Sequence, residues 1–221
     1  LRFKRYRMQS KIILLTTAIL IFVPAIFFFV CDFGQVSIGK RTLLSLFQSV
    51  TTRTAGFNTA DLSSMTEVGQ AIMILLMLMG GSPSSTAGGM KTTTVAVLLL
   101  NAFATFRSRE DAGAFGRRFD SQVIKNAATI AMLYFVLFFF GGITISVYEG
   151  LSLQLCLYEA ASAVGTVGLT LGITPGLHIL SRLILIVLMY LGRVGGLTLI
   201  YAVVSRRNTN AKMPLEKITV G

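Results

Sequence analysis

Two short tracts with matching residue types could bind a dehydrated cation through their backbone. They are residues 54–57 (TAGF) and 166–169 (TVGL), and each follows a short apolar run. In the TVGYG loops of potassium channels, backbone carbonyl oxygens replace the water around such an ion. Glycine suits this use, because a carbonyl aimed at an axial ion requires dihedrals that a β-branched residue resists. The predicted filter residues are Thr54, Ala55, Gly56, Thr166, Val167 and Gly168.

The alternative for these tracts is helix packing, because small residues let helices approach closely. That interpretation fits Gly141 and Gly142 but not the two tracts, since neither tract has helical periodicity. A single TVGL tract is a weak signal, whereas its duplication in a matching context is specific. The short helices that precede the tracts would point their partly negative C-terminal ends toward the ion path. Two roles stay open for Arg53, beside the first tract: bracing the loop or repelling anions.

The elements that must hold these tracts are apolar enough to lie in a membrane. Hydrophobic residues make up 53% of the 221 residues, charged residues make up 13%, and the mean hydropathy is +0.73. Runs of about twenty apolar residues match the ~30 Å hydrocarbon thickness of a bilayer. The sequence therefore predicts an all-α integral membrane protein with four spans and two shorter re-entrant helices. The spans are residues 12–30, 68–106, 127–148 and 179–204, and the short helices are residues 42–52 and 151–163.

The second span is interrupted by a loop rich in glycine, serine and threonine. Its apolar halves, residues 68–79 and 95–106, are each too short to cross a bilayer. Backbone exposed at that depth is tolerated only where it is buried in protein or lines a wet cavity, so the loop is a candidate site. It is not a phosphate-binding loop, because Met90 separates Gly89 from Lys91 and no strand precedes it. A static kink is the alternative to a moving loop.

The net charge of +11 reflects topology rather than nucleic-acid binding. Basic residues gather before the first span, between the second and third spans, and after the last span. The positive-inside rule places these three regions on the cytoplasmic side, where they also attract anionic headgroups. We expect no nucleic-acid partner. Cys31 and Cys156 are isolated and His178 is the only histidine, so we expect neither a disulfide framework nor a metal site built from them.

The order of span, short helix, filter-like tract and span occurs twice. Gly56 and Gly168 are 112 residues apart, and Phe47-Gln48 before the first tract matches Tyr158-Glu159 before the second. Such duplication determines the fold. We predict two tandem helix–pore-loop–helix repeats, residues 1–112 with a broken second helix and residues 113–221 with a cytoplasmic C-terminal tail. Two repeats provide half of a fourfold ring. We also expect Glu159 to hydrogen-bond the filter backbone.

Together these motifs resemble the Trk/Ktr/HKT superfamily of cation transporters, and within it the membrane subunit of bacterial Ktr-type potassium uptake systems. The resemblance covers almost the whole chain and is specific because four motifs combine. The motifs are residues 47–59 (FQSVTTRTAGFNT), 80–92 (GGSPSSTAGGMKT), 165–169 (GTVGL) and 192–196 (GRVGG).

The resemblance implies an architecture larger than this chain. In the family, four repeats form a pseudo-fourfold, potassium-channel-like pore, and this chain is similar to the third and fourth. Either the chain is the C-terminal half of a longer subunit or two copies close the ring. We expect the former, because the two repeats have diverged and Leu1 is not a natural start. The resemblance also implies a multi-pass protein of the bacterial plasma membrane, a homodimer, and a cytoplasmic nucleotide-binding regulatory subunit docked on residues 107–125 and 205–221.

The resemblance also implies that the intramembrane loop is a gate beneath the filter. Glycines permit hinge motion there, and hydroxyls and amides can rearrange. Arg193 lies deep in the last span, where a charge is expensive and therefore a functional candidate. We expect it to cap loop carbonyls near Gly80 and Gly81, while Lys91 pairs with loop or headgroup oxygens. The predicted gate residues are Gly80, Gly81, Ser82, Ser84, Ser85, Thr86, Gly88, Gly89, Lys91 and Arg193.

The expected function is potassium transport across the cell membrane, with the potassium ion at the filter and no cofactor in this chain. Some family members admit sodium by replacing a filter glycine with serine, so Gly56 and Gly168 favour potassium. Sodium or sodium-coupled potassium transport is the alternative. A non-transporting membrane assembly subunit, which would need no filter, is a second alternative. The sequence shows no nucleophile, general base or metal constellation, so we expect no enzyme.

Overall fold

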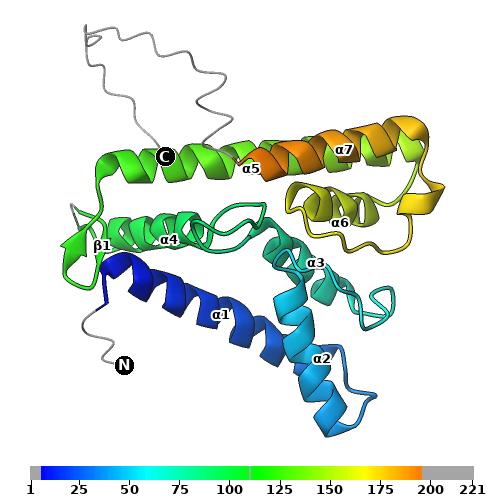
Figure 1. Ribbon diagram of the computed structural model, residues 1–221, viewed down its shortest axis with the longest axis horizontal. Coiled ribbons are helices and arrows are strands. Elements are labelled where there is room, and N and C mark those ends of the chain that lie inside the picture. The colour runs from blue at the N-terminus through cyan, green and yellow to red at the C-terminus, as the bar shows by residue number, and fades with distance from the viewer. Residues whose placement is uncertain (1–5, 110, 196–221) are drawn as a thin grey trace, which may run out of the picture.

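The computed structural model describes residues 6–109 and 111–195, which fold into two similar series of helices (Figure 1). Each series has the order long helix, short helix, loop and helix. The first contains α1 (Met8–Cys31), α2 (Ile38–Thr51), α3 (Glu67–Leu78) and α4 (Thr92–Phe106). The second contains α5 (Ser121–Glu149), α6 (Leu153–Val164), the 3-10 turn η2 (Thr174–Gly176) and α7 (Ile179–Val194). The division of the chain at residues 112 and 113 stays a prediction.

Two of the described helices, α1 and α5, are long and apolar enough to cross a membrane, with 24 and 29 residues. The predicted second span consists of two separate helices, α3 with 12 residues and α4 with 15, around the glycine-rich loop. Helix α7 has 16 described residues. The rest of the predicted last span, residues 196–204, and the predicted cytoplasmic tail lie outside the described residues.

Helices α2 and α5 begin earlier than the apolar runs predict. Helix α2 starts at Ile38 because its first turn is tied to α1: Arg41 Nε donates to the carbonyl of Phe29 at 2.6 Å, and the guanidinium lies 4.3 Å from the Phe29 ring centroid. Helix α5 starts at Ser121 because the side chain of its N-cap, Asp120, accepts from a backbone N–H of the first turn. Capping of this kind stabilises a helix by about 1 kcal/mol.

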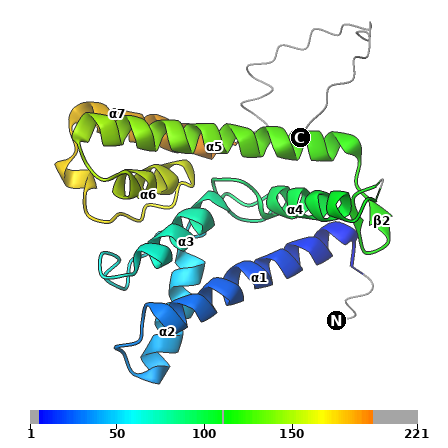
Figure 2. The same cartoon turned by 180° about the vertical axis from the view of Figure 1, so that it is seen from behind.

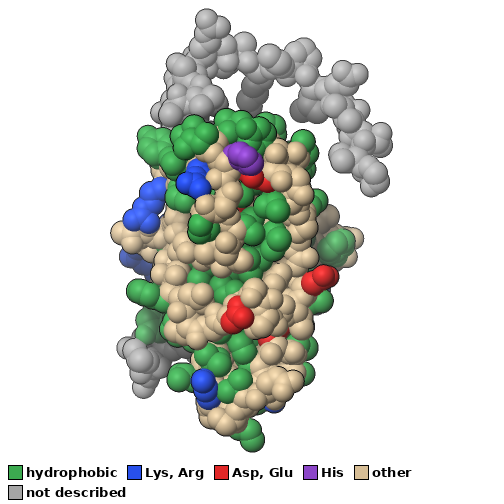
Figure 3. All heavy atoms as spheres, turned by 90° about the vertical axis from the view of Figure 1, so that its right-hand side faces the viewer, with side chains coloured by type: hydrophobic (Ala, Val, Ile, Leu, Met, Phe, Trp, Pro, Cys, Tyr) green, Lys and Arg blue, Asp and Glu red, His purple; other side chains and the backbone are tan. Residues whose placement is uncertain are grey.

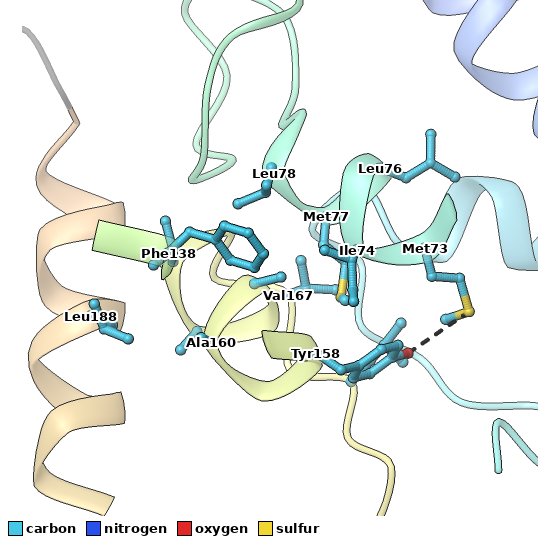
Figure 4. Packing of buried hydrophobic residues seen from close by; sticks show 14 of the residues in the cluster. Met73, Ile74, Leu76, Met77, Leu78, Phe138, Tyr158, Ala160, Val167 and Leu188 are labelled. Carbon is cyan, nitrogen blue, oxygen red and sulfur yellow. Dashed lines mark hydrogen bonds between the residues drawn. The ribbon is translucent and has the colours of Figure 1, made fainter. Parts of the chain in front are cut away.

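The core lies where the two series meet, at the contact between α3 and α6 (Figure 4). Met73 and Met77 of α3 and Tyr158 of α6 are fully buried there, and the Tyr158 hydroxyl lies 3.8 Å from Met73 Sδ. Unbranched methionine side chains adapt to irregular gaps and contact aromatic rings favourably. The packing fixes α3 and α6 relative to each other, and therefore positions the loops that follow these two helices.

In both series, an acidic residue at the C-terminal end of the long helix holds the start of the helix that follows the predicted filter tract. Asp32 Oδ1 accepts from the N–H of Thr66, the N-cap of α3, at 2.8 Å. Glu149 Oε1 accepts from the N–H of His178, the N-cap of α7, at 2.9 Å. Negative charge is favourable at a helix N-terminus, so each contact fixes one long helix to its partner.

The two ends of the molecule differ in charge. The starts of α1 and α5, the end of α4, and the hairpin of β1 (Gly113–Ala114) and β2 (Arg117–Arg118) lie together at one end (Figures 1 and 2). Lys11 Nζ lies 5.4 Å from the centroid of the Phe115 ring at the hairpin turn. Figure 3 shows the opposite end, where charged side chains are sparse among hydrophobic and uncharged ones.

Candidate ion-binding site

The two predicted filter tracts adopt the same backbone pattern. The φ angle is +65° at Thr54 and +73° at Gly56 in the first tract, and +52° at Thr166 and +95° at Gly168 in the second. The residue between them is not in this region in either tract. Positive φ strains a β-branched residue by about 1–3 kcal/mol, and such strain gathers at functional sites. The sequence predicts unusual dihedrals at the glycines; their occurrence at both threonines is new.

In both tracts backbone N–H groups form hydrogen bonds, whereas the carbonyl oxygens do not, within the described residues. Backbone N–H groups donate back to the last turn of the preceding short helix, α2 or α6. The pairs are Ala55 and Gly56 to Thr51 O, Thr166 to Ala163 O, Val167 to Ser162 O, and Gly168 to Ser162 Oγ. Within residues 6–109 and 111–195, none of the six predicted filter carbonyls accepts a hydrogen bond. Only Val167 of the six residues is buried, so these carbonyl lone pairs are open to solvent or to a cation that replaces it.

The two tracts touch each other although they are far apart in sequence. A β-carbon built on Gly56 would come within 1.9 Å of the carbonyl oxygen of Val167, so only glycine permits this approach. The Val167 side chain is 6% exposed and lies in the hydrophobic cluster between the two series (Figure 4). The side chain therefore anchors the second tract in the core, while its carbonyl meets the first tract.

Glu159 braces the segment that follows the second tract. Its side chain is buried, and Oε1 accepts from the N–H of Leu171 at 3.1 Å and from the Thr170 hydroxyl. The other oxygen, Oε2, accepts from the Thr174 hydroxyl at 2.7 Å. The sequence predicts a hydrogen bond from Glu159 to the filter backbone; the backbone group that it bonds is instead the N–H of Leu171, three residues beyond the last predicted filter position. The matching residue of the first series, Gln48, is also buried, and its amide instead contacts a methionine sulfur at 3.4 Å.

The loop between α3 and α4 is closed at its neck by a short piece of parallel ladder. Met79 and Met90 form an isolated bridge, in which the Met90 N–H donates to Leu78 O at 3.0 Å and the Gly80 N–H donates to Met90 O at 2.7 Å. A β-carbon on Gly80 would come within 1.9 Å of Gly88 O. The glycines therefore allow the two sides of the loop to pack, in addition to any hinge function.

Lys91 fastens this loop from its C-terminal side. Its Nζ donates to the carbonyl oxygens of Ala87 at 2.6 Å and Ser85 at 3.2 Å. Of the two partners that the sequence leaves open for Lys91, loop oxygens and headgroup oxygens, the structure shows the loop. Charge-assisted hydrogen bonds are stronger than neutral ones, so this contact is a principal restraint on the loop.

Arg193 lies where two cavities meet. One cavity, of about 540 Å³, is lined by the second filter tract, and the other, of about 430 Å³, is lined by residues 85–87 and Lys91 of the loop. Arg193 lines both, so it lies beside the loop. The expected cap on Gly81 is not among the hydrogen bonds of the described residues, since Gly81 O accepts from the N–H of Thr92 at 3.0 Å.

The remaining predicted gate residues lie in the same loop, which reaches the second filter tract. Ser84 and Gly89 have φ of +68° and +70°. Gly88 packs against the side chain of Thr166, whose Oγ1 is buried without a hydrogen-bond partner among the described residues. The structure thus brings the predicted gate and the predicted filter into contact. The sequence analysis does not predict the roles of Asp32 and Glu149. The polar N-cap residues at 66 and 178 are a weak signal that could have indicated them.

Comparisons with known proteins give one consistent result. A family model described as TrkH, cation transport protein, matches residues 7–211. The potassium/sodium uptake protein NtpJ of Enterococcus hirae is 35% identical over 232 residues, covering 100% of this chain and 51% of NtpJ. Ktr system potassium uptake protein B of Bacillus subtilis is 32% identical over 226 residues, covering 100% of this chain and 51% of that protein. The chain thus spans about half the length of these curated relatives.

A solved structure agrees with the fold. The crystal structure of the potassium transporter TrkH from Vibrio parahaemolyticus matches with a TM-score of 0.71 at 20% sequence identity. The match covers 89% of this chain and 44% of the TrkH chain. It supports the helical architecture described above.

Proposed function

Because this chain belongs to the TrkH family of cation transport proteins, a family of transporters and not of enzymes, we propose that it forms half of a potassium-conducting pore. In this proposal the carbonyls of residues 54–56 and 166–168 line the ion path. Potassium is the transported substrate, in keeping with the names of the relatives from Bacillus subtilis and Enterococcus hirae.

One observation carries the proposal: within the described residues, five of the six N–H groups of the tracts are paired, all but that of Thr54, whereas none of the six carbonyl oxygens is. A bare potassium ion needs oxygen ligands in place of its hydration shell, and a ring of backbone carbonyls supplies them. The C-terminal ends of α2 and α6 precede the tracts and add partial negative charge beside the ion path. A packing role would leave no reason for six unpaired acceptors at matching positions.

The proposed pore needs partners that this chain does not supply. Two repeats provide two sides of a fourfold ring, so two further repeats of the same subunit would complete the filter. We further propose a multi-pass subunit in a bacterial plasma membrane, a homodimer of complete subunits, and a cytoplasmic nucleotide-binding regulatory subunit on residues 107–125. The exposed basic side chains of the hairpin, such as Arg117, are suited to a charged docking surface.

The loop between α3 and α4 is the proposed gate. It is held by Lys91, it contacts Thr166, and it borders the same cavity as Arg193. A loop placed in this way would block or open the path below the filter by moving about its neck, where the bridge between Met79 and Met90 joins its two sides. The alternative, a static kink, is compatible with the backbone bridge at the neck. It gives no reason for the hydrogen bonds from Lys91 to the loop carbonyls.

The test compares Gly168→Ser with Gly172→Ser in the complete subunit. Both glycines have similar φ angles, +95° and +92°, and neither has a neighbour within 4 Å of an added β-carbon. Backbone strain is therefore matched, and only Gly168 belongs to the proposed filter. In cells that lack other potassium uptake, we expect Gly168→Ser to lower the preference for rubidium over sodium at least tenfold and Gly172→Ser to leave it unchanged. Equal effects would refute the filter, sodium preference in the wild type would favour a sodium transporter, and absence of uptake would favour an assembly subunit.

A further inference from the structure

An apolar groove runs between α1 and α4, which lie side by side in Figures 1 and 2. It has a volume of about 460 Å³, and Thr16 is its one polar lining residue. Leu15 and Ile19 of α1 and Leu99 and Phe103 of α4 line it and are at least half exposed. Because α1 is long enough to span a membrane, a groove along it lies at the depth of lipid acyl chains.

A second recess adjoins the groove at the basic end of the molecule. It has a volume of about 240 Å³ and shares Leu100 and Phe103 with the groove. Its polar lining includes Arg107, Arg109 and Asp111. Asp111 Oδ2 lies 3.4 Å from Arg118 Nη1, so the carboxylate charge is balanced from outside the recess. The recess therefore offers two guanidinium groups to an anion.

We propose that the groove and the recess together form a binding site for one anionic phospholipid of the cytoplasmic leaflet. The acyl chain lies between α1 and α4, and the phosphate meets Arg107 and Arg109. The planar guanidinium group matches phosphate oxygens in two-point hydrogen bonds, and anionic lipids gather at the cytoplasmic surface. This site rests on the membrane orientation of the proposed function. A second copy of the chain would have no need of the phosphate-sized basic recess at the end of the groove.

The occupied site would act on the proposed gate. Met79 lines the groove and also forms the bridge with Met90 that closes the neck of the loop. Helix α4, which leaves the loop at Thr92, forms the other wall. A lipid chain in the groove therefore packs against the hinge of the loop and holds α1 and α4 at their present spacing. We expect ion flux to depend on anionic lipid through this contact.

The binding experiment uses the purified complete subunit and phosphatidylglycerol, with retained lipids counted by native mass spectrometry. The charge variant is Arg107→Gln with Arg109→Gln, and its control is Arg117→Gln with Lys125→Gln, which removes two exposed cations from the same end. The groove variant is Thr16→Phe, which fills the groove without changing charge, and its control is the neighbouring Thr17→Phe.

We expect the charge variant and the groove variant each to lower retention of phosphatidylglycerol at least fivefold, and each control to lower it less than twofold. Equal losses in variant and control would indicate diffuse attraction and overturn the site. If the charge and groove variants retained phosphatidylglycerol but lost the dimer or the regulatory subunit, the groove would bind a protein partner and the lipid site would be overturned. Retention is measured without ion flux, so a failure here is distinct from a failure of the filter.

In vesicles, replacing phosphatidylglycerol by phosphatidylcholine should change wild-type rubidium flux severalfold and the charge variant's flux much less; equal responses would overturn the link to the gate.

Discussion

Gly88 of the intramembrane loop lies directly against Thr166 of the second filter tract. A β-carbon built on Gly88 would come within 2.2 Å of Thr166 Oγ1 and 2.8 Å of Thr166 Cγ2. Thr166 is one of two threonines with positive φ among the described residues, so a strained residue of the predicted filter packs against the loop between α3 and α4. Close packing transmits displacement, and movement of the loop would therefore change the support of the filter.

The first prediction concerns Gly88→Ala. The added methyl group must displace either the loop or the Thr166 side chain, and overpacking of this kind costs about 1–3 kcal/mol. A change of about 1–3 kcal/mol in the barrier to ion passage corresponds to about fivefold to 150-fold in rate, so we expect rubidium uptake to fall at least about fivefold. Gly176→Ala is the control, because that glycine has a negative φ and open space around it. Normal uptake by Gly88→Ala would show that the contact does not matter for transport.

The second prediction concerns the ammonium group that holds the loop. Lys91→Met removes the hydrogen bonds to Ser85 O and Ala87 O while keeping the aliphatic stem. A hydrogen bond to a charged group contributes about 1.5–3 kcal/mol, so the loop should open more often. We expect rubidium uptake without the regulatory subunit to rise severalfold, whereas the exposed Lys125→Met should leave it unchanged.

Arg193→Ala tests the other cation: unaltered flux and regulation would remove Arg193 from the gate.

The features of the fold that depend on residue composition, such as glycine tracts and apolar runs, can be predicted from the sequence. Glycine spacing locates both tracts, and the break in the apolar run separates α3 from α4 within a few residues. The strain at Thr54 and Thr166 is not visible, because threonine prefers negative φ and only the surrounding contacts impose the other region. The hairpin at β1 and β2 is also missed, since strands of two residues have no periodicity.

Partner choice in the candidate site was harder to predict than position. The sequence places two cations, Lys91 and Arg193, near the loop, but it favours Arg193 as the cap because an arginine within a span is the more expensive residue. In the structure Lys91 donates to the carbonyls of Ser85 and Ala87, which is one of the two kinds of partner that the sequence leaves open for it. Which cation reaches a carbonyl depends on the path of the loop, and an irregular loop has no period from which its path can be inferred.

The third prediction concerns Glu159→Gln. The carboxylate accepts three hydrogen bonds from Thr170, Leu171 and Thr174, and a glutamine can accept them at one oxygen only. Each hydrogen bond lost from these partly buried groups costs about 1 kcal/mol, so the segment after the second tract should loosen. We expect a lower midpoint of thermal unfolding together with lower potassium selectivity. Glu67→Gln, at an exposed carboxylate of α3, is the control; identical behaviour of the two variants would show that Glu159 has no bracing role.

The last prediction concerns the acid that fixes α1 to α3. Asp32 accepts from the N–H and the hydroxyl of Thr66, and Gly69 leaves room for its carboxylate, since a β-carbon there would come within 2.6 Å of Asp32 Oδ2. Asp32→Ala should lower stability by about 1 kcal/mol through loss of the helix-terminal contact. Gly69→Ala should lower it as well, because the methyl group displaces the carboxylate.

The two changes act on one contact, so their effects should not add. The three heavy atoms nearest to the added methyl group all belong to the Asp32 carboxylate, so the Asp32→Ala background removes the clash, and the alanine gains helix propensity of up to about 1 kcal/mol over glycine. Gly69→Ala should therefore destabilise the wild type and stabilise the Asp32→Ala variant, as measured by thermal unfolding of the purified subunit in detergent. Additive losses would mean that Gly69 is needed for another reason and that the carboxylate does not occupy this place. A general weakening of the fold would make Gly69→Ala destabilising in both backgrounds, so a change of sign between the wild type and the Asp32→Ala variant would be specific to this contact.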